Sequence, residues 1–157
     1  MFRGNTPVQT CRAGLTVGIL LVGLMFAVPA QAQDAAKRLF NSDGGMVLNF
    51  IKPDRTADFE EVVAKLKEAM MKSEDPQRKQ QAASWKVFKS PDPAAGGNSL
   101  YVFVIDPAVP GADYTVSTIL AEAFPAAEVN ELFKKYADAY AQGQNFVNLQ
   151  LVSDLGR

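Results

Sequence analysis

The spacing of apolar residues along the chain alternates between a strand-like and a helix-like period. A nearly continuous apolar run at residues 46–51 follows Gly44-Gly45 and ends at Lys52-Pro53-Asp54, which predicts a buried strand. The next segment predicts a helix that packs through one face, with Thr56 as its N-cap. Its apolar stripe consists of Phe59, Val62, Val63, Leu66 and Met70.

A polar stretch and a hairpin follow this helix. Asp75 is suited to cap a short helix with Pro76 at its first position, and the lack of an apolar face predicts that this helix is solvated. Residues 84–89 and 100–105 have strand character. The Pro- and Gly-rich residues 91–98 lie between them, so we expect an antiparallel hairpin.

The C-terminal part predicts one more helix and one more strand. A short helical segment covers residues 116–124, and a longer helix begins at Pro125 and is expected to end at Gly143. The apolar positions of this longer helix are Val129, Leu132, Phe133, Tyr136 and Tyr140. Residues 146–152 alternate between apolar and polar side chains, which predicts a last strand.

The resulting order, β-α-β-β-α-β, predicts an α+β fold of the ferredoxin-like type. This fold has a four-stranded antiparallel sheet with two main helices on one face. The first and third strands, which are the most apolar, should be central. The other two carry polar residues typical of edge strands, namely Lys86, Lys89, Asn148 and Gln150.

Helices that cover one face of the sheet leave the other face open. Tyr101, Phe103 and Ile105 alternate with Leu100, Val102 and Val104, so the third strand is apolar on both faces. Monomeric proteins rarely expose such a patch. We therefore expect a homodimer in which two sheets pack together across a two-fold axis.

The N-terminus has the pattern of an export signal. Arg3 and Arg12 precede an uncharged, mostly apolar run that extends to Val28, and the small-x-small sequence at residues 30–32 predicts cleavage after Ala32. A spanning helix needs about 20 apolar residues, more than this run offers. We expect residues 1–32 to be a signal peptide, 33–43 a lead-in and 44–157 the domain, which would be periplasmic or extracellular.

Composition restricts the chemistry of this mature domain. The chain has no histidine, and its one cysteine, Cys11, lies in the signal. Disulfides, thiolate catalysis and zinc or haem sites built on His or Cys are therefore excluded, and we expect no cofactor. Of the 17 acidic and 16 basic residues, only Arg3 and Arg12 fall in the signal, so the mature domain is mildly acidic. We expect no nucleic-acid partner and no membrane association after cleavage.

Residues 46–54, followed by a helix that contains Phe59, resemble the dimeric α/β-barrel superfamily in pattern and element order. That superfamily includes antibiotic-biosynthesis-type monooxygenases, haem-degrading monooxygenases and proteins of unknown activity. The resemblance implies a dimeric barrel with any pocket between sheet and helices. Haem-degrading members share an Asn on the first strand, a Trp and a His. Asn49 is similar to the first, but this chain lacks the His.

The candidate ligand-binding residues are Asn49, Trp85, Tyr101 and Tyr136. Each also has an ordinary structural interpretation, because a strand Asn can hydrogen-bond locally and aromatic side chains pack in cores and interfaces. No catalytic residue is identified. The sequence leaves three functions open: a homodimer that binds a small apolar or aromatic ligand, a cofactor-independent monooxygenase-like enzyme, and a structural or interaction protein without a pocket.

Overall fold

A computed structural model describes residues 37–156, so the predicted signal peptide and the predicted cleavage site after Ala32 lie outside the described residues. The strands are β1 (Gly44–Ile51), β2 (Trp85–Lys89), β3 (Ser99–Ile105) and β4 (Asn145–Leu149). The α-helices are α1 (Thr56–Lys72), α2 (Pro76–Ser84), α3 (Val116–Ala123) and α4 (Ala126–Ala139). Short 3-10 turns occur at Pro53–Arg55 and Ala95–Gly97. None of the helices in residues 37–156 is long and apolar enough to cross a membrane.

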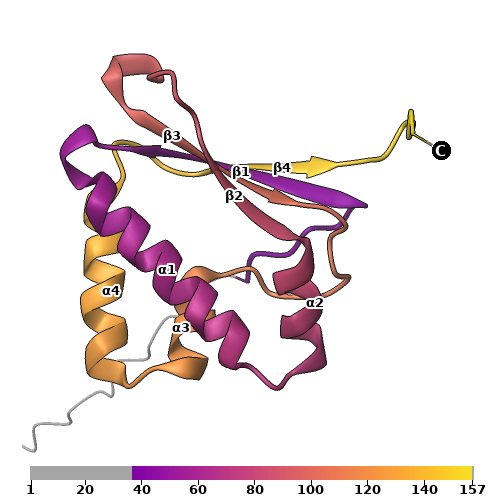
Figure 1. Cartoon of the computed structure of the whole chain (residues 1–157), viewed down its shortest axis with the longest axis horizontal. Helices are drawn as coiled ribbons and strands as arrows, with labels where there is room; N and C mark the ends of the chain where they lie inside the picture. The colour runs from indigo at the N-terminus through magenta and orange to yellow at the C-terminus, as the bar shows by residue number, and fades with distance from the viewer. Residues whose placement is uncertain (1–36, 157) are drawn as a thin grey trace, which may run out of the picture. The chain divides into compact units, whose positions relative to one another are not determined.

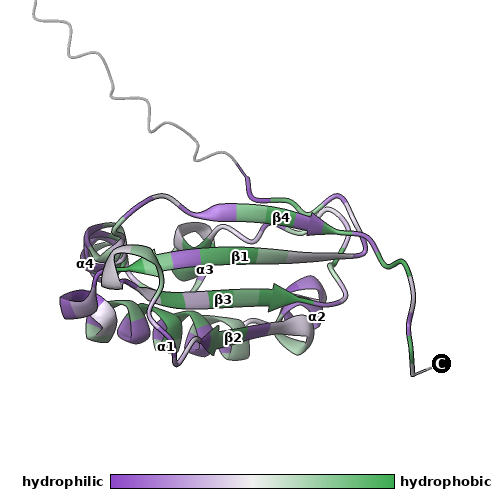
Figure 2. Ribbon diagram, turned by 90° about the horizontal axis from the view of Figure 1, so that it is seen from above, coloured by the Kyte–Doolittle hydropathy of each residue, from purple (hydrophilic) through white to green (hydrophobic). Residues whose placement is uncertain are grey.

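The four strands form one open antiparallel sheet in the order β2-β3-β1-β4. The helices lie together on one side of it (Figure 1). The predicted α+β class and four-stranded antiparallel sheet are therefore confirmed. The two most apolar strands, β1 and β3, are central, and Figure 2 shows them side by side between β4 and β2.

The pairing of β1 with β3 divides their side chains between two faces. Val47 lies opposite Phe103, and Asn49 lies opposite Tyr101. These residues point to the helices and form the covered face, with Ile51 and Ile105, and all are buried. The outer face carries the alternate residues, which are only partly buried although nearly all are apolar: Met46, Leu48, Phe50, Leu100, Val102 and Val104.

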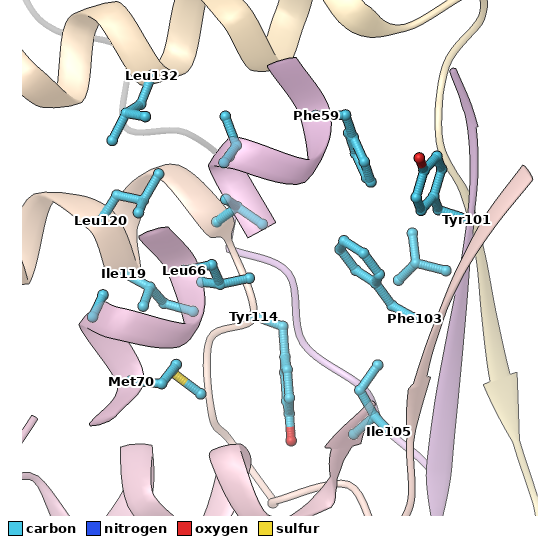
Figure 3. Close-up of a cluster of buried hydrophobic side chains, with 14 of the residues drawn as sticks. Phe59, Leu66, Met70, Tyr101, Phe103, Ile105, Tyr114, Ile119, Leu120 and Leu132 are labelled. Atoms are coloured by element: carbon cyan, nitrogen blue, oxygen red, sulfur yellow. The ribbon is translucent and has the colours of Figure 1, made fainter. Parts of the chain in front are cut away.

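The core lies between the covered face and the helices, and Phe59 of α1 is at its centre. The Phe59 ring lies 4.7 Å from the Tyr101 ring and 6.1 Å from the Phe103 ring. It also contacts Tyr136 and Tyr140 at the α4 end, at centroid distances of 5.7 and 5.9 Å. Figure 3 shows Phe59, Tyr101 and Phe103 gathered between α1 and the sheet. The predicted stripe of α1 thus packs on the sheet, with Phe59, Val62, Leu66 and Met70 buried.

Three predicted element ends are wrong for identifiable reasons. Thr56 is the first residue of α1 and not its cap, because the preceding 3-10 turn already brings the chain into a helical path. Helix α4 ends at Ala139, well before Gly143, because Tyr140 bridges to Ile51 and the Ala141 N–H donates to the Phe50 carbonyl. Strand β4 ends at Leu149 instead of residue 152, because Leu149 pairs with Gly44 at the start of β1.

Helix α2 corrects the expectation of a solvated helix. Asp75 caps it as predicted, accepting a hydrogen bond from the Gln77 N–H at 2.8 Å. However, Arg78, Gln81 and Ser84 are buried. The Arg78 guanidinium forms two hydrogen bonds with Glu122 of α3, at 2.9 and 2.7 Å, and also donates to the Gln81 side chain and the Asp113 carbonyl. A polar helix face is therefore buried through hydrogen bonds, a mode that an apolar period does not detect.

We expect Arg78→Ala to lower the free energy of unfolding by about 2 kcal/mol, because it leaves the buried Gln81 Oε1 without its donor and removes the hydrogen bonds to Glu122. Lys79→Ala is the matched control, since Lys79 is the next residue of α2 and is exposed. Its effect should be within about 0.5 kcal/mol. Urea unfolding of both variants measures the difference, and equal effects would show that the Arg78 contacts do not anchor α2.

Candidate functional site

A cavity of about 240 Å³ lies between the covered face of the sheet on one side and the segment before α3, the start of α3 and helix α4 on the other. Every strand contributes to its lining, and so does the segment that precedes β1. Most lining side chains are apolar or aromatic: Phe40, Val47, Trp85, Phe103, Ile105, Tyr114, Val116, Phe133, Tyr136 and Phe146. The more polar ones are Arg38, Thr115, Ser117 and Gln144. The cavity thus has an aromatic wall and a polar part.

The aromatic wall is a chain of ring contacts. Phe40 lies 5.1 Å from Tyr114 and 5.9 Å from Phe146, measured between ring centroids. Trp85 lies 5.4 Å from Tyr114 and 5.5 Å from Phe103. Gly45 makes room for Phe40, because a Cβ at position 45 would come within 2.1 Å of the Phe40 ring. These contacts hold the wall rigidly against the sheet.

The lead-in segment is fixed by hydrogen bonds to the segment before α3. The Arg38 N–H donates to Asp113 Oδ1 at 3.0 Å and to Thr115 Oγ1 at 3.1 Å, and the Tyr114 N–H donates to the Arg38 carbonyl at 2.8 Å. Burial disfavours the charge on Asp113, but hydrogen bonds from Thr115 and Arg38 still keep the pKa of this carboxyl below its usual value. Within the predicted lead-in, Arg38 and Phe40 are thus part of the cavity wall.

Asn49 belongs to a polar network directly behind the cavity. Its side-chain Nδ2 donates to the Val47 and Tyr101 carbonyls, both at 3.2 Å. Its Oδ1 accepts from Tyr140 Oη and from Gln144 Nε2, both at 2.8 Å. Asn49 is fully buried and its amide is fully used by protein groups. Its role in the structure is therefore to orient Gln144, which does line the cavity.

The same network includes two phenols. Gln144 Nε2 lies 2.9 Å from Tyr136 Oη and 2.7 Å from Tyr140 Oη. Burial raises the pKa of Tyr136 to about 12 and also raises the pKa of Tyr140. Both phenols therefore stay neutral around pH 7 and serve as hydrogen-bonding groups, not as bases.

Trp85 contributes the one buried side-chain polar atom that has no hydrogen-bond partner among the described residues, its indole Nε1. Buried polar groups nearly always have a partner, so an unpaired donor calls for an explanation. Trp85 lines the cavity, but the Nε1 atom itself is enclosed by protein atoms.

The sequence-based candidates are only partly brought together. Trp85 and Tyr136 line the cavity, and Asn49 lies one hydrogen bond behind it. Tyr101 does not line it, because its ring packs under Phe59 and its hydroxyl donates to Glu60 of α1.

Most lining residues are not among the sequence-based candidates, including Arg38, Tyr114 and Gln144, which carry functional groups of the cavity. Arg38 and Tyr114 lie in segments without a regular period, and Gln144 follows the residue expected to end a helix. No local pattern pointed to any of them. A search for aromatic residues in loops would have found Tyr114, and also Phe40.

A larger hollow of about 410 Å³ lies at the edge of the sheet, between α1, α2 and β2. Its lining is mainly aliphatic, with Val63, Leu66, Met70, Met71, Ala82 and Val87 beside Trp85, and Lys67 is the only charged residue. It offers fewer polar groups to orient a ligand than the first cavity, which is therefore the stronger candidate site.

Comparisons of this chain with protein-family models, with curated proteins and with solved structures find no match.

The raised pKa of Tyr136 predicts how stability depends on pH. The phenol ionises near its ordinary pKa of 10.0 in the unfolded chain but near 12 in the folded one. Its contribution to stability is therefore complete below about pH 10 and is lost as the pH rises toward about 12. Between about pH 8 and pH 11 the wild type should lose about 1 kcal/mol through this group. Urea unfolding at both pH values should show a smaller loss in Tyr136→Phe, and an equal loss would contradict the assignment.

Proposed function

We propose that the mature domain is an exported homodimer that binds a small apolar or aromatic molecule in the cavity between sheet and helices. The observation that carries this proposal is the aromatic-walled cavity of about 240 Å³ with Trp85 and Tyr136 in its lining. Ligand sites are typically apolar concavities with a few convergent polar groups. The cavity is smaller than the roughly 300–1,000 Å³ of typical ligand pockets, so the binding function that we propose is for a ligand of about one ring.

Binding also has more support than catalysis. The lining includes no carboxylate and no lysine, and its phenol Tyr136 stays protonated at neutral pH. A cofactor-independent monooxygenase-like reaction would need amide and phenol groups free to hydrogen-bond the substrate. The Asn49 amide is instead occupied by Val47, Tyr101, Tyr140 and Gln144. We therefore propose ligand binding as the function and keep a cofactor-independent monooxygenase-like enzyme as the second candidate.

The homodimer is proposed from the outer face of the sheet. Partly exposed apolar residues cover both central strands there, and Phe88 on β2 and Leu149 on β4 extend them to the edges. Phe88 lies opposite Val102, and its side chain is 53% exposed. The strand order β2-β3-β1-β4 supports a ferredoxin-like subunit. Packing of two outer faces would give the assembly of a dimeric α/β barrel.

Two neighbouring substitutions on β3 test the dimer. Val102 points to the outer face and Phe103 to the core, so Val102→Asp should give a folded monomer whereas Phe103→Asp should fail to fold. Light scattering and circular dichroism at tens of micromolar protein measure both effects. A wild-type domain that is monomeric under these conditions would refute the proposed interface.

Ligand binding can be followed at Trp85, the only tryptophan of the chain. Benzyl alcohol, a neutral aromatic probe, should shift the single indole N–H resonance in a saturable way because Trp85 lines the cavity. Ser117→Phe places a ring at the lining and should abolish the shift. Thr118→Phe is the matched control, because the adjacent Thr118 is not a lining residue. An unchanged spectrum in the wild type would refute the proposed function.

A further inference from the structure

The polar part of the cavity contains a cation, Arg38, that has no anionic partner among the described residues. The Arg38 guanidinium carbon lies 4.5 Å from the centroid of the Phe146 ring, on which it rests. Among the salt bridges of the described residues, none involves Arg38. Its side chain lines the cavity and the residue is exposed, so the guanidinium remains able to bind an anion.

Asp113, the carboxylate that contacts the Arg38 backbone, is otherwise engaged. Its Oδ1 accepts hydrogen bonds from the N–H groups of Arg38 and Thr115 and from the Thr115 hydroxyl. The charge of Arg78 also acts on it from α2. Asp113 is not among the lining residues. The Arg38 guanidinium is thus available to the cavity, whereas the Asp113 carboxylate beside it accepts hydrogen bonds from backbone N–H groups and from Thr115.

A second feature of the cavity favours negative charge. Thr115, Val116 and Ser117, at the start of α3, line it. Thr115 occupies the N-cap position but makes no capping hydrogen bond; its hydroxyl oxygen accepts from the Arg38 N–H at 3.1 Å, and its hydroxyl donates to Asp113. The start of α3, where the helix dipole is positive, therefore lies at the cavity, and the Asp113 carboxylate beside it accepts from the Thr115 N–H.

We propose that the ligand of this cavity is a small planar aromatic carboxylate, with its ring against the Phe40, Trp85 and Tyr114 wall and its carboxylate at Arg38. This inference rests on the proposed function of the same cavity. A guanidinium pairs with a carboxylate through two parallel hydrogen bonds, which gives geometric selectivity for that group. A dry cavity of about 150 Å³ accepts benzene, so the volume here suits one ring with a substituent.

The test compares three probes by titration of the Trp85 indole resonance. Benzoate carries ring and charge, benzyl alcohol carries the ring alone, and acetate carries the charge alone. We expect benzoate to bind on the order of tenfold more tightly than benzyl alcohol, since hydrogen bonds to charged groups are the stronger ones. Acetate should bind more weakly than either, because it cannot fill the aromatic wall.

Variants of two adjacent basic residues, Arg38 and Lys37, then test whether Arg38 causes the preference for benzoate over benzyl alcohol. Arg38→Gln should remove the preference for benzoate, with a much smaller effect on the affinity for benzyl alcohol than on that for benzoate, and Arg38→Lys should restore part of the preference. Lys37→Gln removes a neighbouring positive charge from an exposed residue outside the lining and should keep the preference.

The outcomes separate this inference from the proposed function. If benzyl alcohol binds but benzoate binds no more tightly, or if Arg38→Gln keeps the preference, the carboxylate assignment is overturned and the cavity remains a neutral aromatic site. If Arg38→Gln weakens both aromatic probes equally, or Lys37→Gln abolishes the preference as well, the assignment of selectivity to Arg38 is also overturned. If neither aromatic probe binds, both proposals fail together.

Discussion

The register between β1 and β3 determines which side chains meet the helices, and the rest of the domain depends on it. With Val47 opposite Phe103 and Asn49 opposite Tyr101, one face supplies the core, the cavity wall and the Asn49 network. A slip of one residue would exchange the two faces and bury Val102 and Leu48 in place of Phe103 and Asn49. Phe59 would then lose the ring contacts that hold α1 on the sheet.

Elements with a clear apolar period were predictable from the sequence, whereas contacts between polar groups were not. The two central strands and the stripe of α1 follow from side-chain spacing alone. A strand or helix buries one face only if its apolar residues recur at the matching period. Helix α2 shows what the apolar period does not predict. Arg78 and Gln81 look like surface residues in a polar helix, yet they are buried because Glu122 and the Asp113 carbonyl, more than 30 residues away in the chain, satisfy them.

The candidate site shows the same division. Trp85 and Tyr136 were identified because aromatic residues stand out in any segment, and both line the cavity. Arg38 lies in a segment without periodicity, and its place depends on hydrogen bonds to Asp113 and Thr115, which follow three strands and two α-helices later in the chain. Tyr101 carried the same sequence signal as Tyr136. Only the tertiary contacts with Phe59 and Glu60 separate their roles.

The sheet places the two proposed surfaces back to back. Phe103 lines the cavity and Val102, the next residue, faces outward, so each surface can be altered without direct contact with the other. This separation gives the dimer and ligand hypotheses independent tests. It also limits any coupling between them to movements of the sheet itself. Because a packed core resists such movements, the affinity of the cavity should depend little on dimerisation unless the strands shift when the outer faces meet.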